Sequence, residues 1–334
     1  MIEEVWNEDL WGRGFGQCTL RVYESKADLY YSQESERPYV VVWLHGMHQG
    51  PIDEATLRKM QRRMWRRVIF VVPTNPEPAN GLHFSWGCCF TKAQNREDLG
   101  YVHGDLHKSF LSALTGKVNQ VADWYNAERV LAMGYSMGGF GAFHLGTFAP
   151  QAYDAVVSIA GYGIGTWEPT QSSGAPQPKA SRVFDWYLGT EIPKLADVPI
   201  VMAVHARNDS ISSFHDVNAI VDRVAESARL SRKRTSARLV EVPEELANSD
   251  YSKRQRKTSG HGYFNCSLLK DRSEDFVWKE LRSLLETSDY RKRRTARQEP
   301  EAPPAPSSES STFEGKWTWS NASSNSQSKR QRYR

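Results

Sequence analysis

Residues 130–143, VLAMGYSMGGFGAF, join an apolar run to a helical pattern through a serine set among glycines. The run at 130–133 is short and wholly apolar, which is typical of a buried strand. Ser136 stands in the pattern G-x-S-x-G. A strand-to-helix turn this tight strains the serine backbone and needs small neighbours, which Gly134 and Gly138 supply. The stretch therefore predicts a serine hydroxyl raised above the end of a strand.

Other apolar runs of the same kind lie on both sides of this stretch. They are residues 39–44, 68–72, 155–159 and 200–204. Short runs rich in Val and Ile, without polar alternation, favour strands that are covered on both faces. Upstream, residues 19–23 and 29–32 are expected to form an antiparallel leading pair, and 238–242 to form a last strand.

Helical patterns alternate with these strands. Apolar residues recur close to every 3.6 positions over 104–126, and similar patterns cover 140–148, 217–230 and 276–285. Strands that alternate with helices indicate βαβ units. We therefore predict an α/β fold with a mostly parallel central sheet and helices on both faces.

The chain divides into a body and a tail by composition. Of the net charge of +4, residues 287–334 contribute +5, and they are rich in Ser, Pro, Arg and Gln. We predict a domain over 1–286 and a disordered tail over 287–334. The nearly neutral body gives no electrostatic reason to bind nucleic acid. The basic runs at 291–294 and 329–332 resemble nuclear-localisation signals or weak nucleic-acid contacts, although such runs more often only aid solubility.

Several protein classes are disfavoured by what the sequence lacks. No stretch approaches the roughly 20 apolar residues of a membrane-spanning helix. The first ten residues carry no basic segment followed by an apolar one, so we expect no signal peptide and a cytoplasmic protein, or a nuclear one if the tail directs it there. The four cysteines, Cys18, Cys88, Cys89 and Cys266, match no zinc pattern and are expected to be thiols.

A serine hydroxyl needs a base that takes its proton. In folds built on this turn, the acid and then the histidine follow the serine along the chain. Beyond the helical pattern at 140–148, which itself holds His144, the histidines that follow Ser136 are His205, His215 and His261. His205 ends a predicted strand before the acid candidate, and His215 is expected to open a helix. His261, which lies between two glycines beyond the last strand, is therefore the predicted base.

The acid is expected where a strand ends on the same edge of the sheet. Asp209 follows the strand at 200–204 after a short loop, so its carboxylate could bond the distal nitrogen of His261 and hold the tautomer. Asp216 is the alternative, but an aspartate at a helix start more often caps the helix.

Two backbone N–H groups are expected to form an oxyanion hole. One belongs to Met137, directly after the nucleophile, and the other to Met47, in the loop LHGMHQG at 44–50. His45 and His48 could instead be metal ligands, but no third ligand accompanies them, so we predict no metal. This chemistry requires no cofactor.

Four motifs together resemble the esterase and peptidase branch of the α/β-hydrolase superfamily, which includes phospholipase/carboxylesterase-like, feruloyl esterase-like and polyhydroxybutyrate depolymerase-like proteins. They are LHGMHQG at 44–50, GYSMGGFGAF at 134–143, VHARND at 204–209, and RLVEV followed by GHGYF at 260–264. The resemblance covers about residues 38–286. It implies triad roles for Ser136, Asp209 and His261 and oxyanion roles for Met47 and Met137. In such proteins the histidine follows the last strand closely, whereas here residues 243–260 intervene.

Three functions are compatible with these residues. The first is an esterase that acts on a small-molecule ester, with substrate-facing candidates Trp86, Trp167 and Trp186 in loops expected over the site; ordinary loop packing explains these side chains equally well. The second is a small serine peptidase with the same triad. The third, a binding protein without catalysis, is disfavoured because no triad member is missing.

Overall fold

A computed structural model describes much of the body of the chain. The described residues are 2–9, 19–25, 37–46, 52, 54–64, 66–74, 83–86, 88–90, 105–164, 166, 182–209, 211–243, 261 and 276–286. The expected tail, the expected strand at 29–32 and the cysteines at 18 and 266 lie outside these residues.

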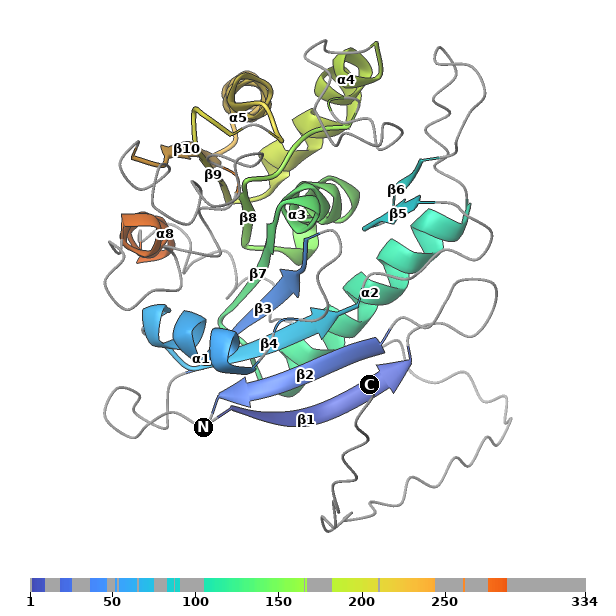
Figure 1. Cartoon of the computed structure of the whole chain (residues 1–334), viewed down its shortest axis with the longest axis vertical. Helices are drawn as coiled ribbons and strands as arrows, with labels where there is room; N and C mark the ends of the chain where they lie inside the picture. Colours follow the sequence, from blue (N-terminus) through green and yellow to red (C-terminus); the bar gives the residue numbers. More distant parts are fainter. Residues whose placement is uncertain are drawn as a thin grey trace, which may run out of the picture.

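An eight-stranded sheet forms the centre of the molecule (Figure 1). Its strands, in spatial order, are β1 (Ile2–Asp9), β2 (Thr19–Ser25), β4 (Val68–Pro73), β3 (Tyr39–Leu44), β7 (Arg129–Tyr135), β8 (Ala155–Ile159), β9 (Ile200–His205) and β10 (Ser236–Glu241). The pairs β1–β2 and β2–β4 are antiparallel, and the pairs from β4 to β10 are parallel. A separate antiparallel pair consists of β5 (His83–Ser85) and β6 (Cys88–Phe90).

The strand order reverses direction next to β3. The chain passes from β3 to β4 on one side, whereas β7, on the other side of β3, leads on to β8, β9 and β10. In open parallel sheets, ligands bind beyond the carboxyl ends of the strands at such a switch point. The ends of β3 and β7 are therefore the place to look for a functional site.

Helices cover both faces of the sheet (Figure 1). They are α1 (Glu54–Arg63), α2 (Asp105–Trp124), α3 (Met137–Phe148), α4 (Arg182–Trp186), α5 (Phe214–Leu230) and α8 (Phe276–Glu286), with 3-10 turns η1 (Pro150–Ala152) and η3 (Ile192–Asp197) and a π-helical turn η2 (Tyr187–Glu191). Successive side chains of β3 point alternately into the hydrophobic layers on the two faces of the sheet. Val40 and Val42 belong to the core cluster of α2, α3 and α5, whereas Val41 and Trp43 belong to that of α1 and α8.

The predicted strands and helices that fall within the described residues are confirmed with small shifts of their ends. The strand predicted at 155–159 is β8 residue for residue, while β7 is longer than its apolar run because Arg129, Gly134 and Tyr135 continue the ladder. The antiparallel pair predicted between residues 19–23 and 29–32 is wrong, because other strands are the partners of β2. Strand β2 pairs with β1 on one edge and with β4 on the other, so both of its ladders are occupied. The polar composition of residues 2–9 concealed β1, since an outer strand needs little apolar sequence.

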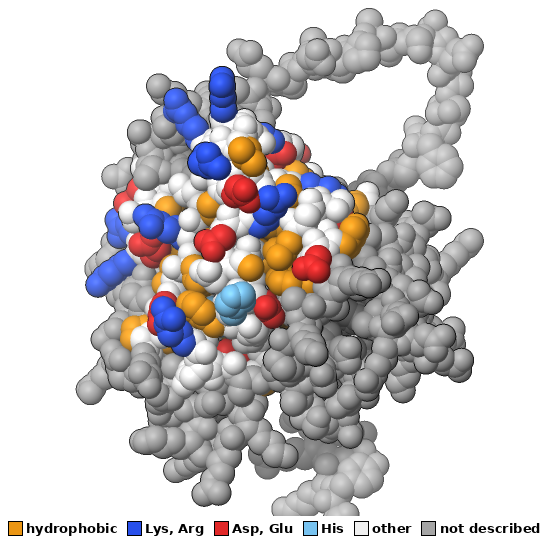
Figure 2. Space-filling view, turned by 90° about the horizontal axis from the view of Figure 1, so that it is seen from above, with side chains coloured by type: hydrophobic (Ala, Val, Ile, Leu, Met, Phe, Trp, Pro, Cys, Tyr) orange, Lys and Arg blue, Asp and Glu red, His pale blue; other side chains and the backbone are white. Residues whose placement is uncertain are grey.

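The described surface mixes charges of both signs. Figure 2, which views the α4 and α5 end of the molecule, shows Lys and Arg side chains with Asp and Glu side chains between them. Within the described part of the chain, no helix is long and apolar enough to cross a membrane.

Candidate active site

Ser136 occupies a strained turn between β7 and α3. Its backbone has φ 56° and ψ −118°, a combination that residues with a side chain rarely adopt. Its N–H donates to Ile159 O at 2.8 Å, so the ladder between β7 and β8 continues to this residue. The next residue, Met137, begins α3. The hydroxyl therefore lies at the carboxyl edge of the sheet and at the N-terminal end of a helix, as the glycine pattern predicted.

Glycines let three backbone segments meet beneath this turn. A Cβ atom on Gly134 would lie 2.2 Å from Gly138 O, and one on Gly138 would lie 1.9 Å from Leu44 O. Neither obstacle is a side chain that can move aside. The end of β3 and the start of α3 can thus approach closely only because both positions lack a side chain.

Three side chains from distant parts of the chain form a continuous hydrogen-bonded row. The Ser136 hydroxyl lies 2.9 Å from His261 Nε2, and His261 Nδ1 lies 2.8 Å from Asp209 Oδ2. A carboxylate accepts from Nδ1–H, which leaves Nε2 free to accept the serine proton. The structure thus brings together the three residues that sequence reasoning selected.

The Asp209 carboxylate is buried and bonded on both oxygens. Oδ1 accepts from the N–H groups of Ile211 and Ser212 at 2.8 and 2.9 Å, and Oδ2 accepts from the Ser212 hydroxyl at 3.0 Å. Burial alone would raise the pKa of Asp209, but the hydrogen bond and charge of His261, together with the Ser212 N–H bond, lower it below its ordinary value. The carboxylate is therefore ionised at neutral pH.

Tyr135, directly before the nucleophile, ties the histidine to the sheet. Its hydroxyl donates to His261 O at 2.7 Å, and the two rings lie 5.5 Å apart. Both side chains are buried, at 4% and 5% exposure. This bond fixes His261 against β7 although 126 positions separate the two residues.

The loop after β3 lies next to this row. Trp86 donates its indole N–H to His45 O at 2.9 Å, and His45 Nδ1–H donates to Gly46 O at 2.8 Å. Burial lowers the pKa of His45, so its imidazole is neutral. Of the two expected oxyanion donors, Met137 lies at the start of α3, and Met47 lies outside the described residues.

The three expected substrate-facing tryptophans differ in their placement. Trp86 is 1% exposed, so its side chain packs inside rather than opening toward a substrate, which corrects that expectation. Trp186 ends the helix α4 rather than lying in a loop, and it is 38% exposed. Trp167 lies outside the described residues.

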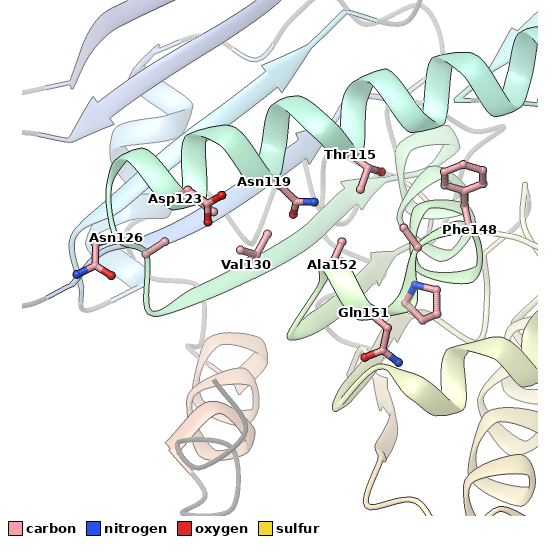
Figure 3. A pocket seen from close by; sticks show the side chains of 12 residues that line it. Thr115, Asn119, Asp123, Asn126, Val130, Phe148, Gln151 and Ala152 are labelled. Atoms are coloured by element: carbon pink, nitrogen blue, oxygen red, sulfur yellow. The ribbon is translucent and has the colours of Figure 1, made fainter. Parts of the chain in front are cut away.

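A cavity of about 760 Å³ lies away from this row (Figure 3). Asn119 and Asp123 of α2, Val130 at the start of β7 and Gln151 of η1 are among its lining residues. Ser136 follows the opposite end of β7, about 20 Å from Val130 at the usual rise of a strand. This cavity is therefore separate from the candidate active site.

The alternatives kept open by the sequence lie elsewhere. Asp216 is in the first turn of α5, where its N–H donates to the Ser213 hydroxyl, and burial raises its pKa. His215 has a side chain that is 93% exposed. Among the described residues, no three His, Cys, Asp or Glu side chains are grouped so that they could hold a metal ion.

Sequence reasoning missed three residues that contact the row. The sequence predicts only that His205 ends a strand, yet its Nε2 lies 3.4 Å from Asp209 Oδ2. Ser212 and Tyr135 were not singled out. Ser212 could have been found, because an aspartate followed by a serine three positions later often forms a local turn in which the carboxylate accepts backbone N–H bonds.

The family model described as "Putative esterase" matches residues 24–237, which is more than half of the chain. The chain belongs to this esterase family. The match includes Ser136 and Asp209, whereas His261 lies beyond its end. No curated protein sequence matches the chain significantly.

Solved structures support the α/β-hydrolase fold at low sequence identity. A bacterial brefeldin A esterase, a homologue of human hormone-sensitive lipase, superposes with a TM-score of 0.52 at 14% identity over 88% of this chain and 78% of that one. A thermostable esterase gives a TM-score of 0.47 at 17% identity. The match covers 81% of this chain and 59% of the thermostable esterase. Est1E from Butyrivibrio proteoclasticus gives 0.48 at 11% identity, over 85% of this chain and 98% of that one. The first of these carries the fold assignment.

Proposed function

We propose that this esterase-family chain is a serine hydrolase that cleaves carboxylic esters of small molecules through an acyl-enzyme. The observation that carries the proposal is the row of hydrogen bonds from Ser136 to His261 at 2.9 Å and from His261 to Asp209 at 2.8 Å. Nucleophile, base and orienting acid each lie within the reach that acyl transfer requires.

The first half of the reaction forms the acyl-enzyme. His261 Nε2 takes the Ser136 proton as the hydroxyl oxygen attacks the ester carbonyl, and it returns that proton to the departing alcohol. The negative charge that develops on the carbonyl oxygen is stabilised by the N–H groups of Met137 and Met47, each contributing about 3 kcal/mol. Met137 is suited to this because it begins α3, where N–H groups lack helical partners.

The second half repeats the steps with water. His261 removes a proton from the water that attacks the acyl carbonyl, and Ser136 leaves with that proton. Asp209 keeps the proton of the neutral imidazole on Nδ1 and stabilises the imidazolium formed in each half. Trp167 and Trp186 remain our candidates for contacts with the substrate, and residues 1–286 are the proposed catalytic domain.

Replacement of the nucleophile tests this function. Ser136→Ala should lower kcat for p-nitrophenyl esters by about 10⁶-fold, because no other group can form the acyl-enzyme. The matched control is Ser213→Ala, since the Ser213 hydroxyl caps α5 by accepting from the Asp216 N–H. Stopped assays on esters of increasing chain length measure the loss of kcat. The same assays on the corresponding anilides show whether the protein cleaves amide bonds as well as ester bonds. Ester turnover by Ser136→Ala near that of the unaltered protein would contradict the proposal, and equal cleavage of anilides would favour a peptidase instead.

A further inference from the structure

Asp209 lies in a short turn that His205 and Ser212 close. Strand β9 ends at His205, and α5 begins two residues after Ser212. Both residues are buried, at 1% and 3% exposure. Their side chains lie within 3.3 Å of each other, and both approach Oδ2 of the carboxylate, at 3.4 Å from His205 Nε2 and 3.0 Å from the Ser212 hydroxyl. The two residues that close the turn are therefore buried polar groups rather than surface side chains.

Ser212 contacts both oxygens of the carboxylate. Its N–H donates to Oδ1 of Asp209 at 2.9 Å and its hydroxyl to Oδ2 at 3.0 Å. Two donors from one residue fix the plane of the carboxylate as well as its position. The same hydroxyl also lies 3.2 Å from Ala160 O, at the end of β8, where Ala160 has a φ of 47°. Ser212 thus joins the acid to two strands of the sheet.

His205 holds Ser212 in turn. Its Nε2 lies 3.0 Å from Ser212 O and 3.3 Å from the Ser212 hydroxyl oxygen. A carbonyl only accepts, so Nε2 carries the proton and donates it. Nδ1 is buried and has no hydrogen-bond partner among the described residues. Burial lowers the pKa of His205, which agrees with a neutral imidazole of this tautomer.

We propose that His205 and Ser212 are positioning residues of the active site: His205 fixes Ser212, and Ser212 holds the Asp209 carboxylate against His261 Nδ1. This inference rests on the proposed function. It extends the row by two members, neither of which touches the reacting atoms. If the Asp209 carboxylate could rotate, His261 would no longer be held in line with Ser136. If the carboxylate lost a hydrogen-bond donor, it would attract the proton on His261 Nδ1 more strongly.

Removal of the hydroxyl tests the role of Ser212. Ser212→Ala keeps the backbone N–H and deletes only the bond to Oδ2. We expect kcat to fall about tenfold, the cost of one hydrogen bond, with little change in KM. The acid-side midpoint of the pH profile of kcat/KM should move to higher pH, because the carboxylate then stabilises protonated His261 more strongly. Ser213→Ala, one position along, should change neither quantity.

Two replacements of His205 separate positioning from packing. The amide nitrogen of glutamine can take the place of Nε2, whereas that of asparagine lies near Nδ1. His205→Gln should therefore retain most of the turnover, while His205→Asn should lower kcat and shift the pH profile as Ser212→Ala does. The titratable groups that face His205 are Asp209, His261 and Asp216, so Asp216→Asn serves to exclude a contribution of that carboxylate to the shift.

The outcomes distinguish this inference from the proposed function. Unchanged kcat and pH profile in Ser212→Ala, or equal losses in both His205 variants, would overturn the positioning role while Ser136→Ala remained inactive. If Ser136→Ala itself retained turnover, the proposed function would fail whatever Ser212→Ala did. A kcat loss and pH shift in Ser212→Ala and His205→Asn, with recovery in His205→Gln, would support the inference.

Discussion

At the scale of single residues, two strained backbone conformations lie where the chemistry is proposed. Ser136 and Ala160 both have positive φ values, 56° and 47°, and they directly follow the neighbouring strands β7 and β8. Each such conformation costs about 1–3 kcal/mol, so surrounding contacts must hold it in place. At Ser136 these include the bond to Ile159 O, and Ala160 donates to Val204 O at 2.8 Å. The strained residues therefore lie directly at the carboxyl ends of two strands, where hydrogen bonds to the next strand hold them.

The acid can be identified by comparing two aspartates. Asp209→Asn keeps the shape but cannot hold His261 in the productive tautomer, so kcat should fall about 10⁴-fold. Asp216→Asn should leave kcat within a few-fold, because this carboxylate lies at the start of α5. Ester turnover of the two purified variants measures the difference. Near-full activity of Asp209→Asn together with a large loss in Asp216→Asn would move the acid role to Asp216.

At the scale of secondary-structure elements, three strands bring their carboxyl ends to one edge of the sheet. The candidate nucleophile follows β7, the acid follows β9, and the loop with the expected oxyanion donor follows β3. His261 belongs to none of these strands, and the hydroxyl of Tyr135 connects it to β7. Strand β7 thus holds the nucleophile through its backbone and the base through a side chain.

Removal of one oxygen atom deletes the hydrogen bond between Tyr135 of β7 and His261. Tyr135→Phe leaves His261 O without its donor, so we expect a loss of about 1–3 kcal/mol in the free energy of unfolding and a several-fold drop in kcat. Tyr153→Phe is the control, because Tyr153 is equally buried and its hydroxyl faces Thr115 away from the site. Urea unfolding and ester turnover measure both effects. A drop in kcat of the same size in Tyr153→Phe would contradict a specific tie.

The sequence predicted the parts of this arrangement that depend on local patterns. The apolar run before Ser136 and the glycines around it define the turn, and the order of histidines along the chain leaves few bases. The contacts of Tyr135 with His261 and of Ser212 with Ala160 join segments far apart in the chain, and no sequence pattern predicts such contacts. Strand β1 was missed for a related reason: its residues pair at the outer edge of the sheet, where polar side chains are tolerated.

At the scale of the whole molecule, the topology places the site at the reversal of strand order between β3 and β7. The two core clusters on either side of the sheet hold these strands in register, and each includes alternate residues of β3. The cavity beside α2 lies at the other end of β7. The fold therefore presents one candidate site where strand ends converge, and a separate hollow near the strand starts.

Acid should destabilise the protein as it protonates buried histidines. Burial lowers the pKa of His205 and of His45 in the folded state. The unfolded chain, with a histidine pKa of about 6.5, then binds protons more readily, so stability is complete above about pH 6.5 and falls below it. The slope should not exceed about 1.4 kcal/mol per pH unit for each histidine. Asp209, whose pKa is lowered, adds a further loss only below about pH 4.

Thermal unfolding between pH 8 and pH 5 measures this effect. His205→Gln removes one of the two groups, so the decline in Tm toward pH 5 should be shallower than in the unaltered protein. A Tm that rises toward pH 5, or an unchanged slope in the variant, would contradict the assigned burial effect.

The boundary of the catalytic domain is a prediction at the same scale. Deletion of residues 290–334 should leave kcat and KM for esters unchanged, because the proposed site is complete within residues 1–286. A loss of more than a few-fold in turnover on this truncation, with unaltered thermal unfolding, would show that the tail contributes to the site.

The central claim is that Ser136 is a nucleophile activated by His261. Its most direct measurement is mass spectrometry of the folded protein after treatment with a fluorophosphonate probe, which reacts with activated serines. We predict a single adduct, mapped to the peptide that contains Ser136, which is absent after unfolding and in His261→Ala. An unlabelled Ser136 in folded protein that hydrolyses esters, or an adduct on another serine, would contradict the account.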